Sequence, residues 1–386
     1  IKKKPGSTEP RLVLDYKQTI NEGILRPQHY QPSAEQLSEE FKPGLKVWAA
    51  MDIKSAYWLL PLAEGPNGSE LTTFSTHLGN YCWRVMPMGV KPAGDYLAGT
   101  MVEVLAPVKE KVKRLVDDLA TGAANDEEMY NTLKLLFSQC REFGVALNAE
   151  KFCYGHRINF GGCILSEDGV TADPNRLQAL AELETPHHTA QDRRFLGICQ
   201  TLSQYTACLQ QSTINMKRLL RKDVPFQWGE EEEREFNAVK KEMSDPKLLS
   251  FFKPGLTLGL DVDTNPSKGI GYVAYQFDEE KGEPGQGNFN LLKLGSISAN
   301  ERWCRYSAIE NEANGILVAL KKLNYFYIGC PRIVVRTDHR PLQQAWTNRD
   351  LTELSPRMRK ILLELYEYNL EMKWVAGSSP ALLLVD

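Results

Sequence analysis

The sequence lacks most features that mark secreted, membrane-spanning or disulfide-stapled proteins. Cysteine accounts for 8 of 386 residues, and no two cysteines form a C-x-x-C pair. A disulfide scaffold is therefore excluded, and no Cys/His spacing supports a zinc site. No apolar run is long enough to span a bilayer. We expect an intracellular protein with reduced, mostly buried thiols and no signal peptide, since the lysines after Ile1 are followed by no apolar core.

A basic excess is also missing. The net charge is -3, whereas nucleic-acid-binding domains usually carry a positive excess. Charge alone therefore favours an ordinary solvated surface. Basic residues do cluster at the start of the chain and again over 217–222, and such segregation can present a basic stripe to phosphates. We weigh a duplex-facing role and a solvated helix end equally for the 217–222 cluster.

The first half of the chain shows a mixed pattern of helix and strand signals. Residues 46–53 are expected to form a strand, and residues 112–121 a hairpin with its turn at Asp117 and Asp118. Asn125 and Glu128 fit a capping box that begins a helix ending at Gly144. These elements predict a sheet with polar residues at its strand ends.

The second half begins with a helix expected from about 192 to 209. After the break at 253–255, the predicted order is strand, strand, helix, strand. The expected ranges are 256–262, 271–277, a helix capped by Ser307 and Glu310 that runs to 323, and 332–337. We place domain boundaries near 185 and near 250.

The pair Asp117 and Asp118 is unusual at the turn of an apolar hairpin. Like charges side by side repel each other, and Asp is a poor strand residue. A divalent cation removes that cost, because carboxylate oxygens suit Mg²⁺. With Asp52 at the end of another strand, three carboxylates could hold two ions roughly 3.5–4 Å apart, as in phosphoryl transfer. A lone Asp-Asp pair would more simply be a polar turn. The residues around the pair therefore decide between a polar turn and a metal site.

Those neighbouring residues resemble the reverse transcriptases of gypsy-type (Metaviridae-like) LTR retrotransposons. The similar segments occur in the family's order along the chain. They are MDIKSAYWLLPL at 51–62, TFST at 73–76, VMPMG at 85–89, LVDD at 115–118, FGVALN at 143–148 with Lys151, and FGG at 160–162. One departure is Leu115, which stands where the family has a tyrosine. We therefore expect primer grip or fidelity to differ from that of the family.

The resemblance implies a set of site residues. Asp52, Asp117 and Asp118 would be the polymerase metal ligands, with two Mg²⁺ ions per active site and Mn²⁺ as a substitute. Tyr57 matches the aromatic residue that rejects the 2′-hydroxyl by bulk, with a half-buried core tyrosine as the alternative. The implied contacts to the incoming deoxynucleoside triphosphate (dNTP) are Lys4, Arg11, Tyr57, Met88, Gly89 and Lys91.

A second set of acids lies in the C-terminal third. Asp263 ends a predicted strand, Glu312 lies early in a helix, and Asp338 ends a later strand. This is a compact way to gather carboxylates around Mg²⁺, although each acid alone would more simply be a surface residue. Their surroundings resemble the RNase H domain of the same elements, in the segments GIG at 269–271, RYS at 305–307 and TDHRPL at 337–342.

Three assignments within this set stay open. Asp261 competes with Asp263, which we prefer because the sequence Asp-Thr-Asn fits the family's D-A-S better. Glu310 competes with Glu312, which we prefer by its spacing to Ile316. Asp386 is the only acid available as the fourth ligand, but its spacing is two residues longer than in the family.

The expected fold is α+β: a right-hand polymerase of fingers, palm and thumb, a short connection, and an α/β RNase H-fold domain. We expect fingers and palm in 1–185, thumb and connection in 186–250, and RNase H in 251–386. The expected function is RNA- and DNA-directed DNA synthesis together with RNase H cleavage of RNA–DNA hybrids.

The resemblance also implies partners and a location. The partners would be an RNA template, a DNA primer, RNA–DNA hybrid and dNTPs, with a homo- or heterodimer as the assembly and with protease and integrase adjacent in a polyprotein. The location would be cytoplasmic, within virus-like particles, or nuclear. Two alternatives stay open: a reverse transcriptase with an inactive RNase H, and a domesticated nucleic-acid-binding protein without catalysis.

Overall fold

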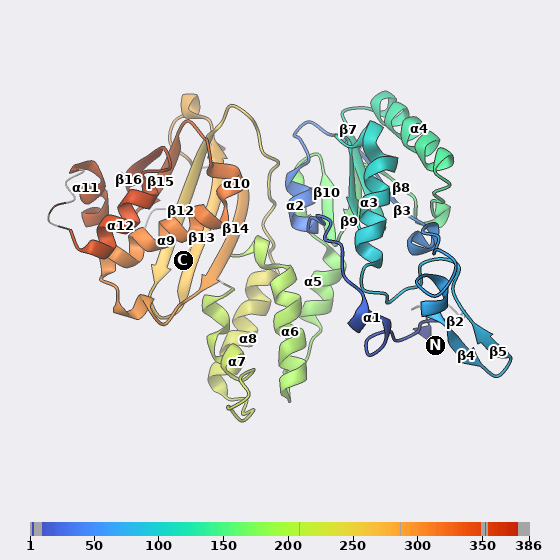
Figure 1. Cartoon of the computed structure of the whole chain (residues 1–386). Coiled ribbons are helices and arrows are strands. Elements are labelled where there is room, and N and C mark those ends of the chain that lie inside the picture. Colours follow the sequence, from blue (N-terminus) through green and yellow to red (C-terminus); the bar gives the residue numbers. More distant parts are fainter. Residues whose placement is uncertain are drawn as a thin grey trace. The chain divides into compact units, whose positions relative to one another are not determined.

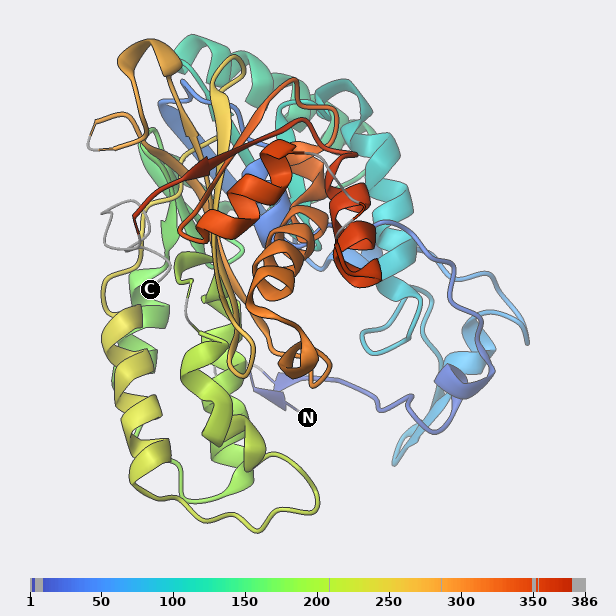
Figure 2. The ribbon, with the colours of Figure 1, turned by 90° about the vertical axis from the view of Figure 1, so that its left-hand side faces the viewer.

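A computed structural model describes residues 2–3, 10–207, 209–285, 287–348, 352 and 354–376, with side chains described from residue 12 onward. The chain divides into two compact units, Ile1–Glu167 and Asp168–Asp386, whose helices and strands are drawn in Figures 1 and 2. The domain boundaries expected near 185 and 250 stay predictions. Among the described residues, no helix combines the length and apolarity needed to cross a membrane.

A four-stranded sheet in the order β6-β7-β3-β8 forms the centre of the first unit. Its strands are antiparallel to their neighbours and are β3 (Val47–Asp52), β6 (Val112–Leu115), β7 (Asp118–Ala123) and β8 (Cys153–Gly155). Helices α3 (Ala93–Leu105) and α4 (Asp126–Glu142) share one buried core with β3 and β7. This packing fixes the strand ends at which the acidic residues stand.

Shorter elements surround this sheet. They are β1 (Lys2–Lys3), β2 (Pro10–Arg11), α1 (Ile20–Gly23), α2 (Ala34–Glu39), β4 (Phe74–Thr76), β5 (Gly79–Tyr81), β9 (Arg157–Phe160) and β10 (Cys163–Ser166).

The cap of α4 follows the prediction in part. The Asn125 side chain accepts a hydrogen bond from the backbone N–H of Glu128 at 2.9 Å, as expected for an N-cap. The Glu128 carboxylate, however, accepts from the N–H of Ala124 at 3.1 Å rather than from that of Asn125. The helix ends at Glu142, and Gly144 adopts φ +68°, the left-handed conformation that glycine adopts at helix ends.

The second unit begins with one short strand and several helices and continues into a five-stranded sheet. Its early elements are β11 (Gly169–Ala172), α5 (Pro174–Ala181), α6 (Thr189–Thr201), α7 (Ile214–Arg218) and α8 (Glu230–Met243). The sheet has the order β14-β13-β12-β15-β16. Its strands are β12 (Thr257–Asn265), β13 (Gly269–Phe277), β14 (Asn290–Ser298), β15 (Ile333–Thr337) and β16 (Leu370–Trp374).

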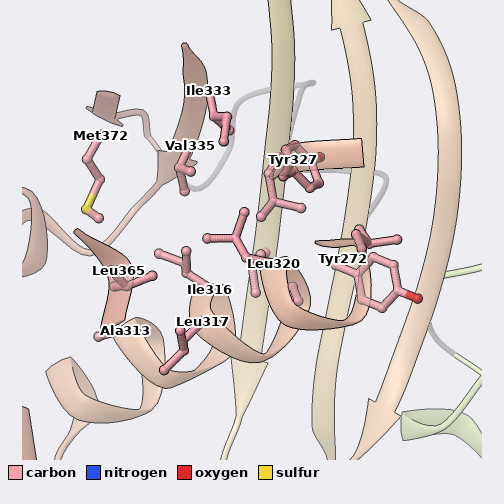
Figure 3. Packing of buried hydrophobic residues seen from close by; sticks show 14 of the residues in the cluster. Tyr272, Ala313, Ile316, Leu317, Leu320, Tyr327, Ile333, Val335, Leu365 and Met372 are labelled. Atoms are coloured by element: carbon pink, nitrogen blue, oxygen red, sulfur yellow. The ribbon is translucent and has the colours of Figure 1, made fainter. Parts of the chain in front are cut away.

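One face of this sheet is covered by helices. The helices of this region are α9 (Ala308–Lys322), α10 (Asn324–Tyr327), α11 (Arg340–Asn348) and α12 (Pro356–Leu365). Figure 3 shows Ile316, Leu317 and Leu320 of α9 packed toward the sheet residues Ile333 and Val335. The capping box of Ser307 and Glu310 is present, as the sequence predicts, and it begins α9 at Ala308.

Two expectations about the second unit were wrong. The helix expected to reach residue 209 ends at Thr201. Leu202, Tyr205 and Leu209 continue the apolar spacing, but they are buried from a short 3-10 helix and turns that follow α6. The expected order also missed β14. Lys293 and Gly295 interrupt its alternation, although Lys293 is buried and donates to the Tyr325 hydroxyl at 2.6 Å.

Candidate active sites in the two units

The first carboxylate group forms where β3 meets the hairpin β6–β7. Asp52 and Asp118 are directly paired across β3 and β7. The N–H of Ile53 donates to the carbonyl of Asp117 at 2.8 Å, which holds the end of β3 against the turn of the hairpin. The three aspartates predicted from the sequence therefore come together at one end of the two inner strands of the sheet. Asp52 is buried, with 9% of its surface exposed.

Backbone strain marks the same place. Among the described residues, Ser55 (φ 53°) and Val116 (φ 57°) are the two non-glycine residues with positive φ. This conformation is a strong outlier for a β-branched residue such as valine. Ser55 follows Asp52 by three residues, and Val116 immediately precedes Asp117. Strain of this kind persists where surrounding contacts enforce it, and it clusters at functional sites.

The charges in the group are only partly balanced. Burial raises the pKa of the Asp118 carboxyl, and the nearby Asp117 and Asp52 raise it further, while Lys151 opposes the rise. Lys151 Nζ lies 2.6 Å from Asp52 Oδ1. Lys151 belongs to a segment that resembles a family motif, but nothing in its spacing indicates this contact with a residue 99 positions earlier.

Tyr57 lies beside the same acids. It is half-buried against the core of the first unit, which agrees with the core-tyrosine alternative. Burial raises the pKa of its hydroxyl, the charge of Asp117 raises it further, and Arg114 lowers it. Tyr57 is therefore both a packing residue and a neighbour of Asp117, so the two interpretations of its sequence position are compatible.

The segment with Met88, Gly89 and Lys91 is held by a residue that the sequence analysis missed. Asn21 donates from Nδ2 to the carbonyl of Gly89 at 2.9 Å and accepts from the N–H of Lys91 at 2.7 Å. Gly89 has φ +96°, and a Cβ there would lie 3.2 Å from the carbonyl oxygen of Leu14. The segment thus has a fixed turn. No local pattern around Asn21 signals this role.

The remaining predicted nucleotide contacts are described only in part. Lys4 lies outside the described residues, and for Arg11 only the backbone is described, paired with Lys2 in the small sheet of β1 and β2. Leu115, which replaces the family tyrosine, lies against Gly161. A Cβ on Gly161 would come within 2.8 Å of Leu115 Cδ2, so glycine at 161 makes room for the leucine.

The second carboxylate group forms in the second unit. Burial raises the pKa of Glu312 to about 8, with further contributions from the negative charges of Asp263 and Asp338. Asp263 is paired with Gly271 near the end of β12, Glu312 lies on α9, and Asp338 follows β15. The structure therefore brings together three acids that are spread over 75 positions of the sequence, from Asp263 to Asp338 (338 − 263).

The two competing acids are occupied elsewhere. Asp261 is fully buried and accepts hydrogen bonds from Arg336 and Tyr275. The Glu310 carboxylate accepts from Ser355 Oγ at 2.6 Å and from Arg357 at 3.1 Å. Both acids thus have structural partners, which supports the preference for Asp263 and Glu312. Asp386 lies outside the described residues.

The donor chemistry of both groups suits a cation, although neither is a closed metal site as it stands. Within the described part of the chain, no set of three or more His, Cys, Asp and Glu side chains is arranged so that it could hold a metal ion. Both groups nevertheless contain carboxyls whose pKa is raised by burial and by neighbouring acids. A divalent cation would relieve that repulsion.

Two family matches cover most of the chain. Residues 1–199 match the family "Reverse transcriptase (RNA-dependent DNA polymerase)", and residues 253–368 match the "RNase H-like domain found in reverse transcriptase". The expectation of a reverse transcriptase region followed by an RNase H-like domain is therefore confirmed.

Curated relatives are polyproteins of transposons. The chain is 26% identical over 373 residues to the retrovirus-related Pol polyprotein from transposon 412 of Drosophila melanogaster, covering 95% of this chain and 28% of the relative. It is 25% identical to the transposon Tf2-3 polyprotein of Schizosaccharomyces pombe, covering 98% and 28%. The chain thus spans less than a third of the length of these two relatives.

Solved structures share the fold. One is a foamy viral protease-reverse transcriptase in complex with double-stranded DNA, with TM-score 0.79, 17% identity, and coverage of 96% of this chain and 75% of that one. Another is the foamy viral enzyme in complex with RNA/DNA hybrid, with TM-score 0.75, 16% identity, and coverage of 97% and 50%. On the family match over residues 1–199, this chain belongs to the reverse transcriptase family, and an RNase H-like domain follows in the same chain.

Proposed function

We propose that the first unit extends a DNA primer on RNA and DNA templates, and that Asp52, Asp117 and Asp118 carry this reaction. The observation that supports the proposal most strongly is the pairing of Asp52 with Asp118 beside the strained turn at Val116. In the reaction, the primer 3′-hydroxyl attacks the α-phosphate of a dNTP and pyrophosphate leaves.

The three aspartates would hold two Mg²⁺ ions, with Mn²⁺ able to replace them. When bound, the ions supply positive charge that polarises the attacking and leaving oxygens. Tyr57, which is close enough to Asp117 for that charge to raise the pKa of its hydroxyl, would lie under the sugar of the incoming nucleotide and exclude a 2′-hydroxyl by its bulk. The turn around Gly89, held by Asn21, would line the nucleotide position together with Met88 and Lys91.

We propose that the second unit cuts the RNA strand of RNA–DNA hybrids. Asp263, Glu312 and Asp338 would hold Mg²⁺ there, and the mutual repulsion of these acids supports a cation at this place. The 2′-hydroxyls and the groove shape distinguish such a hybrid from DNA. Asp386 remains a proposed fourth ligand.

The wider context is also a proposal. The similarity to transposon polyproteins supports an origin from a longer polyprotein, with protease and integrase nearby. We also propose a homo- or heterodimeric form, and a location that is cytoplasmic, within virus-like particles, or nuclear. Light scattering of the purified chain at several concentrations measures its association state, and a mass that stays monomeric at micromolar concentration would contradict the dimer.

The polymerase proposal is tested by extending a labelled DNA primer on an RNA template. We expect Mg²⁺-dependent extension by the wild-type chain and a loss of at least a hundredfold with Asp117→Asn. Asp126→Asn, at the start of α4, is the matched control and should extend normally. Template binding without extension by the wild-type chain would instead favour a domesticated binding protein, the alternative suggested by Leu115.

The nuclease proposal needs a separate substrate. With a preformed RNA–DNA hybrid, the wild-type chain should cut the RNA strand, Asp338→Asn should not, and Asp117→Asn should cut normally. Primer extension without any hybrid cleavage by the wild-type chain would favour a polymerase with an inactive RNase H.

A further inference from the structure

A buried ion pair joins β12, which carries Asp263 near its end, to β15, which Asp338 follows directly. Asp261 on β12 and Arg336 on β15 are directly paired in the parallel ladder, and 0% and 3% of their surfaces are exposed. Arg336 Nε donates to Asp261 Oδ1 at 2.8 Å, and Arg336 Nη2 donates to Asp261 Oδ2. This is the two-pronged geometry by which arginine fixes a carboxylate in one orientation.

Tyr275 completes the arrangement from the next strand. Its hydroxyl donates to Asp261 Oδ1 at 3.0 Å, and the guanidinium of Arg336 lies 4.8 Å from the centre of its ring. Arg336 Nη1 also donates to the carbonyl of Pro284 at 3.4 Å. The ion pair is therefore surrounded by aromatic and backbone groups from β13 and the loop after it.

The pair stands where the two strands part. The paired positions of β12 and β15 run from Leu258 and Ile333 to Asp261 and Arg336. Beyond them, Asp263 pairs with Gly271 of β13, while Thr337 pairs with Trp374 of β16. Asp263 comes two residues after Asp261, and Asp338 two residues after Arg336. The last cross-strand link before both acids is thus a charged one.

Stability alone does not explain such a link. Taking two charges out of water offsets most of their attraction, and well-packed apolar residues of similar volume often serve as well or better. A two-pronged ion pair does fix the relative register and angle of two strands, which apolar contacts define less sharply. Near a metal site, partners behind the ligands commonly set ligand orientation, and their loss lowers metal affinity by about 10–100-fold.

We propose that Asp261 and Arg336 are positioning residues of the nuclease site, which set the separation of Asp263 and Asp338 for metal binding. The proposal rests on the proposed nuclease function of the second unit. Neither residue touches the metal or the substrate. They act through the two strand ends that carry the ligands.

The test compares variants by direct Mn²⁺ binding, measured by electron paramagnetic resonance on the full chain. All proteins carry Asp117→Asn and Asp118→Asn, so that the polymerase group does not contribute. The decisive variant is the pair Asp261→Leu with Arg336→Met, which removes both charges and leaves no unpaired buried ion. Thermal unfolding establishes that each protein is folded. Asp261→Asn alone leaves the buried guanidinium of Arg336 without a negative partner. The thermal unfolding of this single variant is compared with that of the double variant.

We expect the double variant to fold, to bind Mn²⁺ about tenfold more weakly, and to need correspondingly more metal for hybrid cleavage. Arg336→Lys keeps the charge but loses the two-pronged contact. The Mn²⁺ affinity of this variant should therefore fall between that of the protein with the intact ion pair and that of the double variant. Arg332→Met, at the opposite end of β15, is the control and should bind as tightly as wild type. Its ion pairs with Glu279 and Glu371 lie at the surface.

The outcomes separate the two claims. A folded double variant with wild-type metal affinity overturns the positioning role and leaves the nuclease proposal intact. A chain with the second carboxylate group intact that binds no Mn²⁺ and cuts no hybrid overturns the nuclease proposal, and the positioning role with it.

Discussion

The ammonium of Lys151 lies 2.6 Å from the carboxylate of Asp52. Asp52 is paired with Asp118, whose pKa is raised by burial and by the two neighbouring aspartates. The lysine thus supplies positive charge to three aspartates whose negative charges would otherwise repel one another. A divalent ion would supply the same charge more strongly, so that lysine and metal act on the same carboxylate.

Replacing Lys151 tests this relation. Lys151→Met should destabilise the metal-free chain by about 1 kcal/mol, because a partly exposed ion pair contributes little more than that. Added Mg²⁺ should stabilise the variant more than it stabilises wild type, since the metal now relieves a larger repulsion. Urea unfolding in EDTA and in Mg²⁺ measures both quantities. Lys111→Met removes the exposed pair with Glu128 and is the control. Equal stabilisation of Lys151→Met and wild type by Mg²⁺ would contradict the relation.

The pKa of Glu312 predicts how the second unit responds to pH. Its pKa is raised from 4.5 to about 8, mainly by burial. The unfolded chain releases this proton at lower pH than the folded chain does, so Glu312 makes the metal-free protein progressively less stable as pH rises from about 4.5 to 8. Glu312→Gln should remove this slope. Denaturant titrations across that range measure it, and an unchanged slope in the variant would count against the assignment.

Metal binding at Glu312 should release a proton. Below pH 8 the carboxyl is largely protonated, and a carboxylate ligand must be deprotonated. Calorimetric Mn²⁺ titrations of the chain with Asp117→Asn and Asp118→Asn, in two buffers of different ionisation enthalpy, report the number of protons released. We expect close to one at pH 6.5 and fewer at pH 9. Release that is independent of pH would exclude Glu312 as the titrating ligand.

The strained turn before Asp117 gives a prediction of its own. Val116 has φ 57°, which glycine or asparagine adopts at lower cost. Val116→Gly and Val116→Asn should each raise the free energy of unfolding by about 1 kcal/mol. Primer extension should fall, because the turn then holds Asp117 less firmly. Higher stability with unchanged extension would show that the strain has no part in the reaction.

The elements that carry Glu312 and Asp263, α9 and β12, approach each other closely at Gly315 and Thr264. A Cβ on Gly315 would lie 2.1 Å from Thr264 Oγ1. Gly315→Ala should therefore push α9 from the strand, destabilise the second unit by about 1–3 kcal/mol, and reduce hybrid cleavage more than primer extension.

Removing the obstructing atom should reverse that effect. The Thr264 hydroxyl is buried without a hydrogen-bond partner, so Thr264→Ala combined with Gly315→Ala should restore hybrid cleavage. Gly197→Ala in α6 meets nothing within 4 Å and is the neutral control. Failure of the double variant to recover cleavage would mean that the spacing of α9 and β12 is not what matters.

The sequence predicts which acidic residues stand at strand ends, but it does not predict the contacts that form between distant segments. The positions of Asp52, Asp117 and Asp118 were predictable because each stands at a polar end of an apolar strand. The position of Glu312 early in a helix was predictable because Ser307 marks the start of that helix. The contacts of Asn21 and Lys151 arise only when distant segments meet. Lys151 stands in a family motif, but nothing in the local sequence of either residue signals its contact.

The choice between Asp261 and Asp263 shows the same limit. Alternation places both on one strand face, and the resemblance to the family motif favours Asp263. The structure adds the burial of Asp261 against Arg336, which gives Asp261 a partner of its own. β14 was missed because Lys293 breaks its apolar pattern, although in the fold its ammonium reaches the Tyr325 hydroxyl at the edge of the core. In both cases a polar residue is buried because a residue distant in the sequence pairs with it, and local sequence patterns do not show such a partner.

The central claim is that distant acids form two separate metal sites, one in each unit. Anomalous diffraction from crystals of the chain soaked in Mn²⁺ locates bound manganese directly. We predict one set of peaks within coordination distance of Asp52, Asp117 and Asp118, and a second set beside Asp263, Glu312 and Asp338. Manganese at neither group, or only at other surface acids, would contradict the account.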